Sequence, residues 1–215
     1  MYKKKPLLVT FEGIEGSGKS YQSRILFNNL KRKNIPVILT REPGGTMGAE
    51  KIREVILDDY FHLSSKEQFN RYTDTLLYLA ARNEHMGNKI LPAILKKKIV
   101  ICDRFIDSTL AYQVYGKGVN KNLIDTIHNY ILRGIKPDLT FVLTVNIKKA
   151  LQRLKKRKKK NRYDKFSKNF YIKVQKAFIK IAKKNKRRYF ILDNSSDSKK
   201  IETFILNRFM KLLPK

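Results

Sequence analysis

The sequence predicts an α/β fold in which helices flank a five-stranded parallel β-sheet. Two observations lead to this prediction. Short apolar runs of strand length alternate along the chain with longer segments whose apolar residues recur at helical spacing. The apolar runs are also nearly continuous and rich in Ile, Val, Leu and Phe, which is typical of strands that a parallel sheet buries on both faces.

The expected elements follow one another in a regular order. Strands are expected at 7–11, 37–40, 99–102, 139–145 and 189–192. Helices are expected at 20–33, 49–57, 68–97 with a division near Gly87 and Pro92, 122–133, 147–158, 170–184 and 198–212. A chain of 215 residues with 42% hydrophobic content suffices for one core. We therefore expect one domain over 1–215, with its core at 7–145 and 163–212.

The composition narrows the class of protein without naming a partner. The 48 Lys and Arg residues against 18 Asp and Glu give a net charge of +30, which would attract nucleotides, nucleic acid or anionic membrane surfaces alike. No stretch approaches the roughly 20 apolar residues of a membrane span, so we expect a soluble protein with no membrane partner. A single cysteine, Cys102, excludes an intramolecular disulfide and suits a cytoplasmic location.

A phosphate-binding loop follows the first expected strand. The stretch matches G-x-x-x-x-G-K-[ST] without a break, and a helical pattern comes after it. The glycines let successive backbone N–H groups point at phosphate oxygens, at the positive end of the helix. ATP is therefore expected to contact Gly13, Ile14, Glu15, Gly16, Ser17, Gly18, Lys19 and Ser20.

Three residues are expected to complete the nucleoside triphosphate site together with a Mg²⁺ cofactor. Lys19 should reach the β- and γ-phosphates, and the Ser20 hydroxyl should be a ligand of the bridging Mg²⁺. Asp103 directly follows the third expected strand, where a carboxylate can hold the ion through its water shell. An Asp after a strand is also common as a turn residue, so its neighbours must support the assignment.

Further segments indicate which molecule receives the phosphoryl group. The sequence reads TREPGGT at 40–46, YLAAR at 78–82, DRFIDSTLAYQ at 103–113 and KPDLT at 136–140. Together with the phosphate loop, these segments closely resemble bacterial thymidylate kinases in order and spacing, over about residues 8–192. The resemblance implies a P-loop NTPase of the nucleoside monophosphate kinase fold, with ATP as donor and deoxythymidine monophosphate (dTMP) as acceptor.

The same resemblance implies roles for residues around the acceptor phosphate and sugar. Arg53 and Arg104 should hold the dTMP phosphate, because a planar guanidinium can donate paired hydrogen bonds to two oxygens. Glu15 is expected near the 3′-hydroxyl, which would offset the cost of a carboxylate amid phosphates. Tyr112 aligns with a ring that crowds the sugar 2′ position, and Gln113 with another acceptor-site residue.

The acceptor base is expected to lie against a helix and the segment after the third strand. Tyr78 and Arg82 are four residues apart, hence on one helix face, and align with positions that stack on thymine and contact its O4. The family often has Phe at the first position, and Tyr preserves the stacking surface. Ser108 and Thr109 align with residues that hydrogen-bond the base edge.

A basic lid is expected at about 153–162. Seven of the eight residues in 155–162 are Lys or Arg. Some family members carry an arginine in the phosphate loop where this chain has Gly16, so the cation for the transition state should come from the lid. Arg162 is the first choice by its match to the family, with Arg153 and Arg157 as further candidates. A solvated charged face or a nucleic-acid patch would give a similar run.

The remaining expectations concern partners and rivals. The resemblance implies a homodimer that requires no nucleic acid. The histidines, His62, His85 and His128, show no metal-ligand spacing and are interpreted as structural. Another nucleoside monophosphate kinase is the nearest alternative, since such enzymes share the loop and the basic lid. A nucleic-acid-dependent ATPase is a more distant one, suggested only by the net charge.

Overall fold

The computed structural model describes residues 6–58, 69–156, 161–196 and 198–213. They form one five-stranded parallel sheet in the order β2-β3-β1-β4-β5. The strands are β1 (Leu8–Glu12), β2 (Val37–Arg41), β3 (Ile99–Asp103), β4 (Leu139–Thr144) and β5 (Tyr189–Asp193). The expected fold class and all five strands are confirmed, with strand ends shifted by one residue or less.

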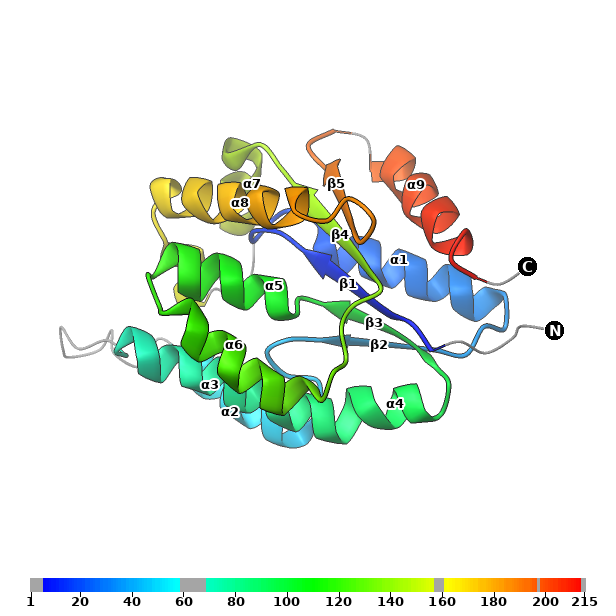
Figure 1. The fold of residues 1–215 in the computed structure, drawn as a ribbon. Coiled ribbons are helices and arrows are strands. Elements are labelled where there is room, and N and C mark those ends of the chain that lie inside the picture. Colours follow the sequence, from blue (N-terminus) through cyan, green and yellow to red (C-terminus); the bar gives the residue numbers. More distant parts are fainter. Residues whose placement is uncertain (1–5, 59–68, 157–160, 197, 214–215) are drawn as a thin grey trace.

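Helices connect the strands and cover both faces of the sheet (Figure 1). The longer helices are α1 (Lys19–Arg32), α2 (Met47–Leu57), α3 (Arg71–His85), α6 (Lys121–Leu132), α7 (Ile147–Lys155), α8 (Lys168–Lys183) and α9 (Ser198–Met210). The segment expected to divide near Gly87 and Pro92 does so, as α3 passes through the π-helical turn η2 (Met86–Ile90) into α4 (Leu91–Leu95). No helix among the described residues is long and apolar enough to cross a membrane.

Three short elements were not predicted. The segment after β3 forms α5 (Ile106–Thr109) and the π-helical η3 (Leu110–Gly116), and the 3₁₀ turn η4 (Arg162–Lys165) precedes α8. Four-residue turns such as α5 and η4 are too short to show helical periodicity in a sequence. The helix expected at 147–158 is described as far as Lys155, and 157–160 lie outside the described residues.

Alternation along the strands divides the core between the two faces. Val9 and Phe11 pack with α1 and α9, whereas Leu8 packs with residues of η2, α4 and α6. In β3, Cys102 is fully buried on this second side. Successive side chains of a strand point to opposite faces, so both faces of each central strand are apolar. This is the physical reason for the continuous apolar runs of the sequence.

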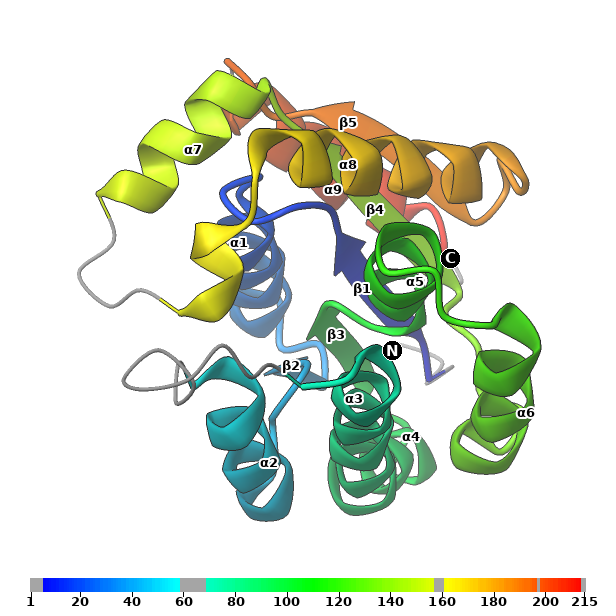
Figure 2. The same cartoon turned by 90° about the vertical axis from the view of Figure 1, so that its left-hand side faces the viewer.

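Parallel pairing also aligns the carboxyl ends of the strands. Phe11 and Arg41 are both in register with Asp103, so polar residues that end or follow these strands meet at one edge. Figure 2 views the molecule from this edge, with α2, α3, α7 and the turn η4 around it. Ligands of open α/β sheets bind at the carboxyl edge, and the fold thus brings the expected site residues together there.

Candidate active site

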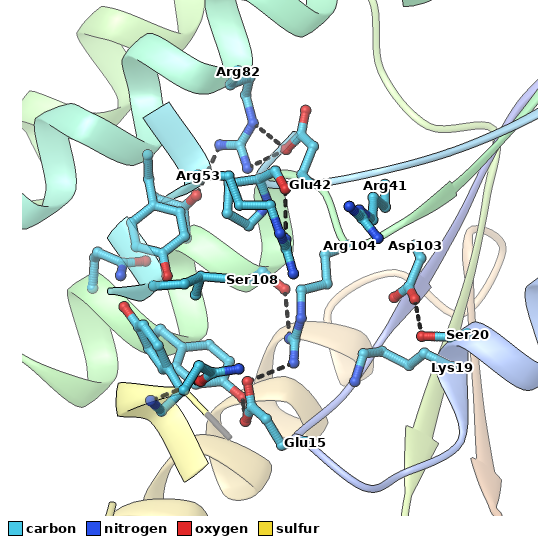
Figure 3. Close-up of a pocket in the computed structure, with 18 residues that line it drawn as sticks. Glu15, Lys19, Ser20, Arg41, Glu42, Arg53, Arg82, Asp103, Arg104 and Ser108 are labelled. Atoms are coloured by element: carbon cyan, nitrogen blue, oxygen red, sulfur yellow. Dashed lines mark hydrogen bonds and ion pairs between the residues drawn. The ribbon is translucent and has the colours of Figure 1, made fainter. Parts of the chain in front are cut away.

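A cleft opens at the carboxyl edge of the sheet (Figure 3). It encloses about 900 Å³, open solvent included. Lys19, Ser20 and Asp103 line one part of it. Its other walls contain every residue expected to contact dTMP: Glu15, Arg53, Tyr78, Arg82, Arg104, Ser108, Thr109, Tyr112 and Gln113. Arg153 and Arg162 do not line it.

The phosphate loop joins β1 directly to α1, and its shape depends on glycine. Gly13 has φ +136°, and a Cβ there would lie 2.2 Å from the Leu143 carbonyl oxygen. Gly18 caps α1 in the left-handed region at φ +93°. L-residues with a Cβ rarely adopt such dihedrals. The glycines therefore allow the close packing that turns the loop at the start of the helix.

Lys19 lies across this loop. Its Nζ donates to the Ile14 carbonyl oxygen at 2.6 Å and to Ser17 Oγ at 3.4 Å. Burial, followed by the charge of Arg104, lowers the pKa of Lys19 to about 7, because both disfavour the ammonium form. A phosphate anion beside it would favour that form again.

The two residues expected to hold Mg²⁺, Ser20 and Asp103, lie next to each other. The Ser20 hydroxyl donates to Asp103 Oδ2, so the first turn of α1 and the end of β3 meet at a single point. The other carboxylate oxygen, Asp103 Oδ1, is buried and has no hydrogen-bond partner among the described residues. A hydroxyl next to a carboxylate oxygen with spare acceptor capacity fits Mg²⁺ and its water shell. The donor set therefore suits the ion that the sequence implies.

Side chains from two other segments hold the loop from outside. Asn194, after β5, donates from Nδ2 to the Ser17 carbonyl oxygen at 2.7 Å. Arg153, on α7, donates from Nη1 to the Gly16 carbonyl oxygen at 2.9 Å and from Nη2 to the Asn194 carbonyl oxygen at 3.2 Å. A guanidinium of the expected lid thus lies on the backbone of the phosphate loop.

Arg53 occupies the opposite wall, on α2. Its Nη1 donates to the Pro43 carbonyl oxygen at 2.6 Å, and burial and the nearby Arg41 lower its pKa. Arg41 donates from Nη2 to Glu50 Oε2 at 3.0 Å, and the same oxygen lies 4.0 Å from Arg53 Nε. Two guanidinium groups therefore share one carboxylate, and an anion in the cleft would complete the charge balance.

Arg104 lies between the phosphate loop and the wall whose residues are expected to contact dTMP. Its Nη1 donates to the Gly13 carbonyl oxygen at 2.9 Å, and its Nη2 donates to Glu15 Oε1 at 2.8 Å. The Tyr112 hydroxyl donates to the other oxygen, Glu15 Oε2. Burial opposes the charge of Arg104, yet Tyr112 and Glu15 raise its pKa above the ordinary value. These contacts join three of the expected site residues.

A buried polar network surrounds Arg82, which is 3% exposed. Its Nε donates to Glu42 Oε2 at 2.7 Å, and its Nη1 donates to Thr109 Oγ1 at 2.8 Å. Nη1 also lies 2.7 Å from His128 Nε2, which must accept because a guanidinium only donates. Burial and Arg82 lower the pKa of His128 to about 3, so this ring is neutral. His85 lies 3.0 Å from Glu42 Oε1.

Ser108 and Gln113 differ in how many hydrogen-bond partners their side chains have. Ser108 Oγ donates to Glu12 Oε2 at 2.6 Å and accepts from Arg104 Nη1 at 3.2 Å. Burial, followed by the charge of Asp107, raises the pKa of Glu12 to about 8. Gln113 is 2% exposed, and its Nε2 has no partner among the described residues. Ser108 is thus tied to the base of the cleft, and Gln113 retains a donor.

Arg162 has a different position from Arg153. Its Nη2 donates to Asp74 Oδ1 on α3, and its guanidinium lies 5.2 Å from the centre of the Tyr163 ring. Arg162 therefore binds a buried carboxylate of α3 in this structure. The third candidate, Arg157, lies outside the described residues, as does His62.

The structure adds residues that the sequence analysis did not assign. The cleft is also lined by Arg41, Leu57, Asn161 and Tyr163. Asp74 lies outside this lining and accepts a hydrogen bond from Arg162. Arg41 ends β2 in register with Asp103. Its position directly after the strand expected at 37–40 could therefore have predicted that it lies at the carboxyl edge, beside the cleft. Nothing in the local sequence separates Asn161 and Tyr163 from the basic run next to them, because their position depends on how η4 packs on α3.

The fold and the cleft define a P-loop phosphotransferase of the nucleoside monophosphate kinase class. A family model described as thymidylate kinase matches residues 11–205. The chain therefore belongs to the thymidylate kinase family.

Individual relatives agree over most of the chain. A thymidylate kinase of Wolbachia pipientis wMel is 48% identical over 179 residues, covering 82% of this chain and 85% of the relative. A thymidylate kinase of Wolbachia sp. subsp. Brugia malayi (strain TRS) is 40% identical over 213 residues, covering 97% and 98%. The crystal structure of thymidylate kinase from Ehrlichia chaffeensis superposes with a TM-score of 0.75 at 34% identity, covering 95% of this chain and 98% of that one.

Proposed function

We propose that this protein transfers the γ-phosphoryl group of ATP to dTMP, giving ADP and dTDP, with Mg²⁺ bound beside the phosphates. The observation that carries the proposal is the composition of the cleft described above. A phosphate loop with Lys19 forms one part of it, and the rest includes three kinds of group that suit a nucleotide: arginines, tyrosines and hydroxyl groups. Two anionic nucleotides can meet in such a cleft only if cations offset their repulsion.

The proposed mechanism is in-line transfer, in which positioning supplies most of the rate enhancement. Lys19 binds the β- and γ-phosphates, while Arg53 and Arg104 hold the phosphate of dTMP as the nucleophile. This phosphate is already an anion, so no strong general base is required. Glu15, bonded to Arg104 and Tyr112, faces the acceptor sugar.

Two further groups act on the transferred phosphoryl group. Ser20 and Asp103 would hold Mg²⁺, which when bound neutralises charge on the ATP phosphates. We assign the transition-state cation to Arg153, since its guanidinium already lies on the phosphate loop. This differs from the first choice of the sequence analysis, Arg162, which is bonded to Asp74.

On the acceptor side, we propose that Tyr78 and Arg82 face the base, together with Ser108, Thr109, Tyr112 and Gln113. We also propose a cytoplasmic homodimer, as family membership suggests. Exposed apolar side chains on α2 and α3, Met47, Val55 and Leu76, support a contact between two copies. Light scattering of the purified protein would give its mass in solution.

A coupled assay of ADP release tests the proposed activity. The protein is supplied with ATP and Mg²⁺ and with dTMP, dUMP, dCMP, UMP or AMP in turn. We expect turnover to be highest with dTMP. A preference for another monophosphate would favour a different kinase of this class, whereas ATP hydrolysis that requires DNA or RNA would favour a nucleic-acid-dependent ATPase.

A further inference from the structure

Asp74 is a fully buried carboxylate outside the cleft. It lies on α3 with 0% exposure, and it accepts hydrogen bonds from cations of two distant segments. Arg162 Nη2, from η4, donates to Oδ1, and Lys117 Nζ, from the loop after η3, donates to Oδ2 at 2.6 Å. A buried carboxylate is costly unless it is paired, and these two cations supply the pairing.

The residue next to Arg162 forms a wall of the cleft. Tyr163 is 4% exposed and lines the cleft. Its ring packs edge-on against Tyr78 and Tyr112, with centroid distances of 6.1 and 5.9 Å. Its carbonyl oxygen accepts from the Tyr171 hydroxyl at 2.5 Å. Tyr163 is therefore in contact with two of the residues that the proposed function assigns to dTMP.

The ion pair and this wall belong to the same short turn. Asn161 caps η4 in a reciprocal arrangement with Asp164, so Arg162 and Tyr163 are carried by one compact unit. On the other side, Asp74 and Tyr78 are four residues apart on α3 and hence on one helix face. The Asp74–Arg162 pair therefore connects η4 to the helix face that carries Tyr78.

We propose that Asp74 is a positioning residue that holds Tyr163, through Arg162, as the wall of the cleft against the nucleoside of the acceptor. The inference rests on the proposed function, because it assumes that dTMP binds in this cleft. It assigns Arg162 to acceptor binding and leaves the transition-state charge to Arg153. Since Tyr163 packs on Tyr78 and Tyr112, loss of the pair should weaken contacts to base and sugar alike and leave the phosphate contacts in place.

The test compares Asp74→Asn with Asp125→Asn. Asp125 is an exposed carboxylate on α6 paired with Lys121, so its variant removes the same charge at a distance from the cleft. Binding of dTMP and of thymidine is measured by titration calorimetry, with kcat and KM for dTMP and thermal unfolding recorded on the same samples. We expect Asp74→Asn to weaken both ligands by roughly tenfold and to change kcat at saturating dTMP by less than about twofold. Asp125→Asn should match the wild type.

A second variant covers the case in which Asp74→Asn fails to fold. Arg162→Met leaves Asp74 paired with Lys117, so no unpaired carboxylate is buried. We expect it to weaken dTMP and thymidine in the same way, and the double variant to lose no more than Asp74→Asn alone. A fall in kcat with unchanged KM would instead make Arg162 the transition-state cation and overturn the inference. Unchanged affinities in folded Asp74→Asn protein would also overturn it.

These outcomes are separate from a failure of the proposed function. If the wild-type protein does not convert dTMP to dTDP, the proposed activity is wrong and the variants are not informative about a thymidine site. If the wild type converts dTMP and the variants bind both ligands as tightly as it does, only the role of Asp74 is wrong.

Discussion

The two sides of the cleft are built in different ways. The proposed donor side is a continuous loop shaped by its backbone, and Asn194 and Arg153 hold it through its carbonyl oxygens. The proposed acceptor side is assembled from side chains of α2, α3, α5, η3 and η4. A site made of backbone is sensitive to any added Cβ, whereas a site made of side chains is sensitive to the loss of a charge or a ring. Mutations can therefore separate the two.

The largest effect is expected on the donor side, from Gly13→Ala. The added Cβ would lie 2.2 Å from the Leu143 carbonyl oxygen at a backbone φ of +136°, and a backbone atom cannot rotate away. We expect the free energy of unfolding to fall by about 3 kcal/mol, as measured by urea denaturation. Gly87→Ala is the matched control, because nothing lies within 4 Å of its Cβ position. This control should be unchanged or more stable by about 0.5–1 kcal/mol. Equal stability of the two variants would contradict the backbone-built donor side.

A smaller effect is expected on the acceptor side, from Arg53→Met. The change removes a partly exposed guanidinium that faces the proposed phosphate position. We expect KM for dTMP to rise roughly 10- to 100-fold, with the affinity for thymidine, which lacks the phosphate, within about twofold of the wild type. Stability should change by less than about 1 kcal/mol.

The control for Arg53 lies on the same helix. Lys51→Met removes an exposed cation of α2 that pairs with Glu54, and KM for dTMP should stay at its wild-type value. If thymidine binding fell as much as dTMP binding in Arg53→Met, Arg53 would contact the nucleoside rather than the phosphate.

The smallest effect is expected in the protonation of Lys19, on the proposed donor side, when ATP binds. The pKa of Lys19 is about 7 in the folded protein, against 10.5 as its ordinary value. Between these values the unfolded chain binds more protons than the folded one, so this group makes stability rise with pH across the window. The ATP phosphates favour the ammonium form. ATP binding should therefore take up most of one proton at pH 8, and the affinity should fall as pH rises above about 7.

Titration calorimetry in two buffers of different ionisation enthalpy measures this uptake. Lys19→Arg is the control, because a guanidinium stays protonated over the whole range and should take up no proton at this position. Equal proton uptake by the two proteins would show that Lys19 is already charged before ATP binds.

Features that depend on residues close together in the chain could be predicted from the sequence. The five strands were predicted because each is a short, mainly apolar run, and β1, β3 and β4 are nearly continuous in this respect because the sheet buries both of their faces. Ser20 and Asp103 were assigned to one Mg²⁺ site from the loop motif and from the position of Asp103 after a strand, and their side chains are in contact. The hydrogen-bond network around Arg82 was predicted only in part. Arg82 and Thr109, which are in contact, were both assigned to the site from the sequence. The contact of Arg82 with His128 was not predicted. The ring of His128 is buried by packing of α6 on α3, which no local pattern encodes.

The sequence by itself determined the succession of strands and helices along the chain, the phosphate loop and the residue types of the proposed acceptor site. A motif of adjacent residues has its geometry fixed by local dihedral angles, and glycine at φ +136° leaves few alternatives. Only the tertiary structure decided which cation reaches which anion. Arg162 and Lys117 meet Asp74 across 88 and 43 positions of the chain, and Arg153 meets Gly16 across 137. Such pairs form when packing brings distant segments together, since long basic side chains can reach several partners.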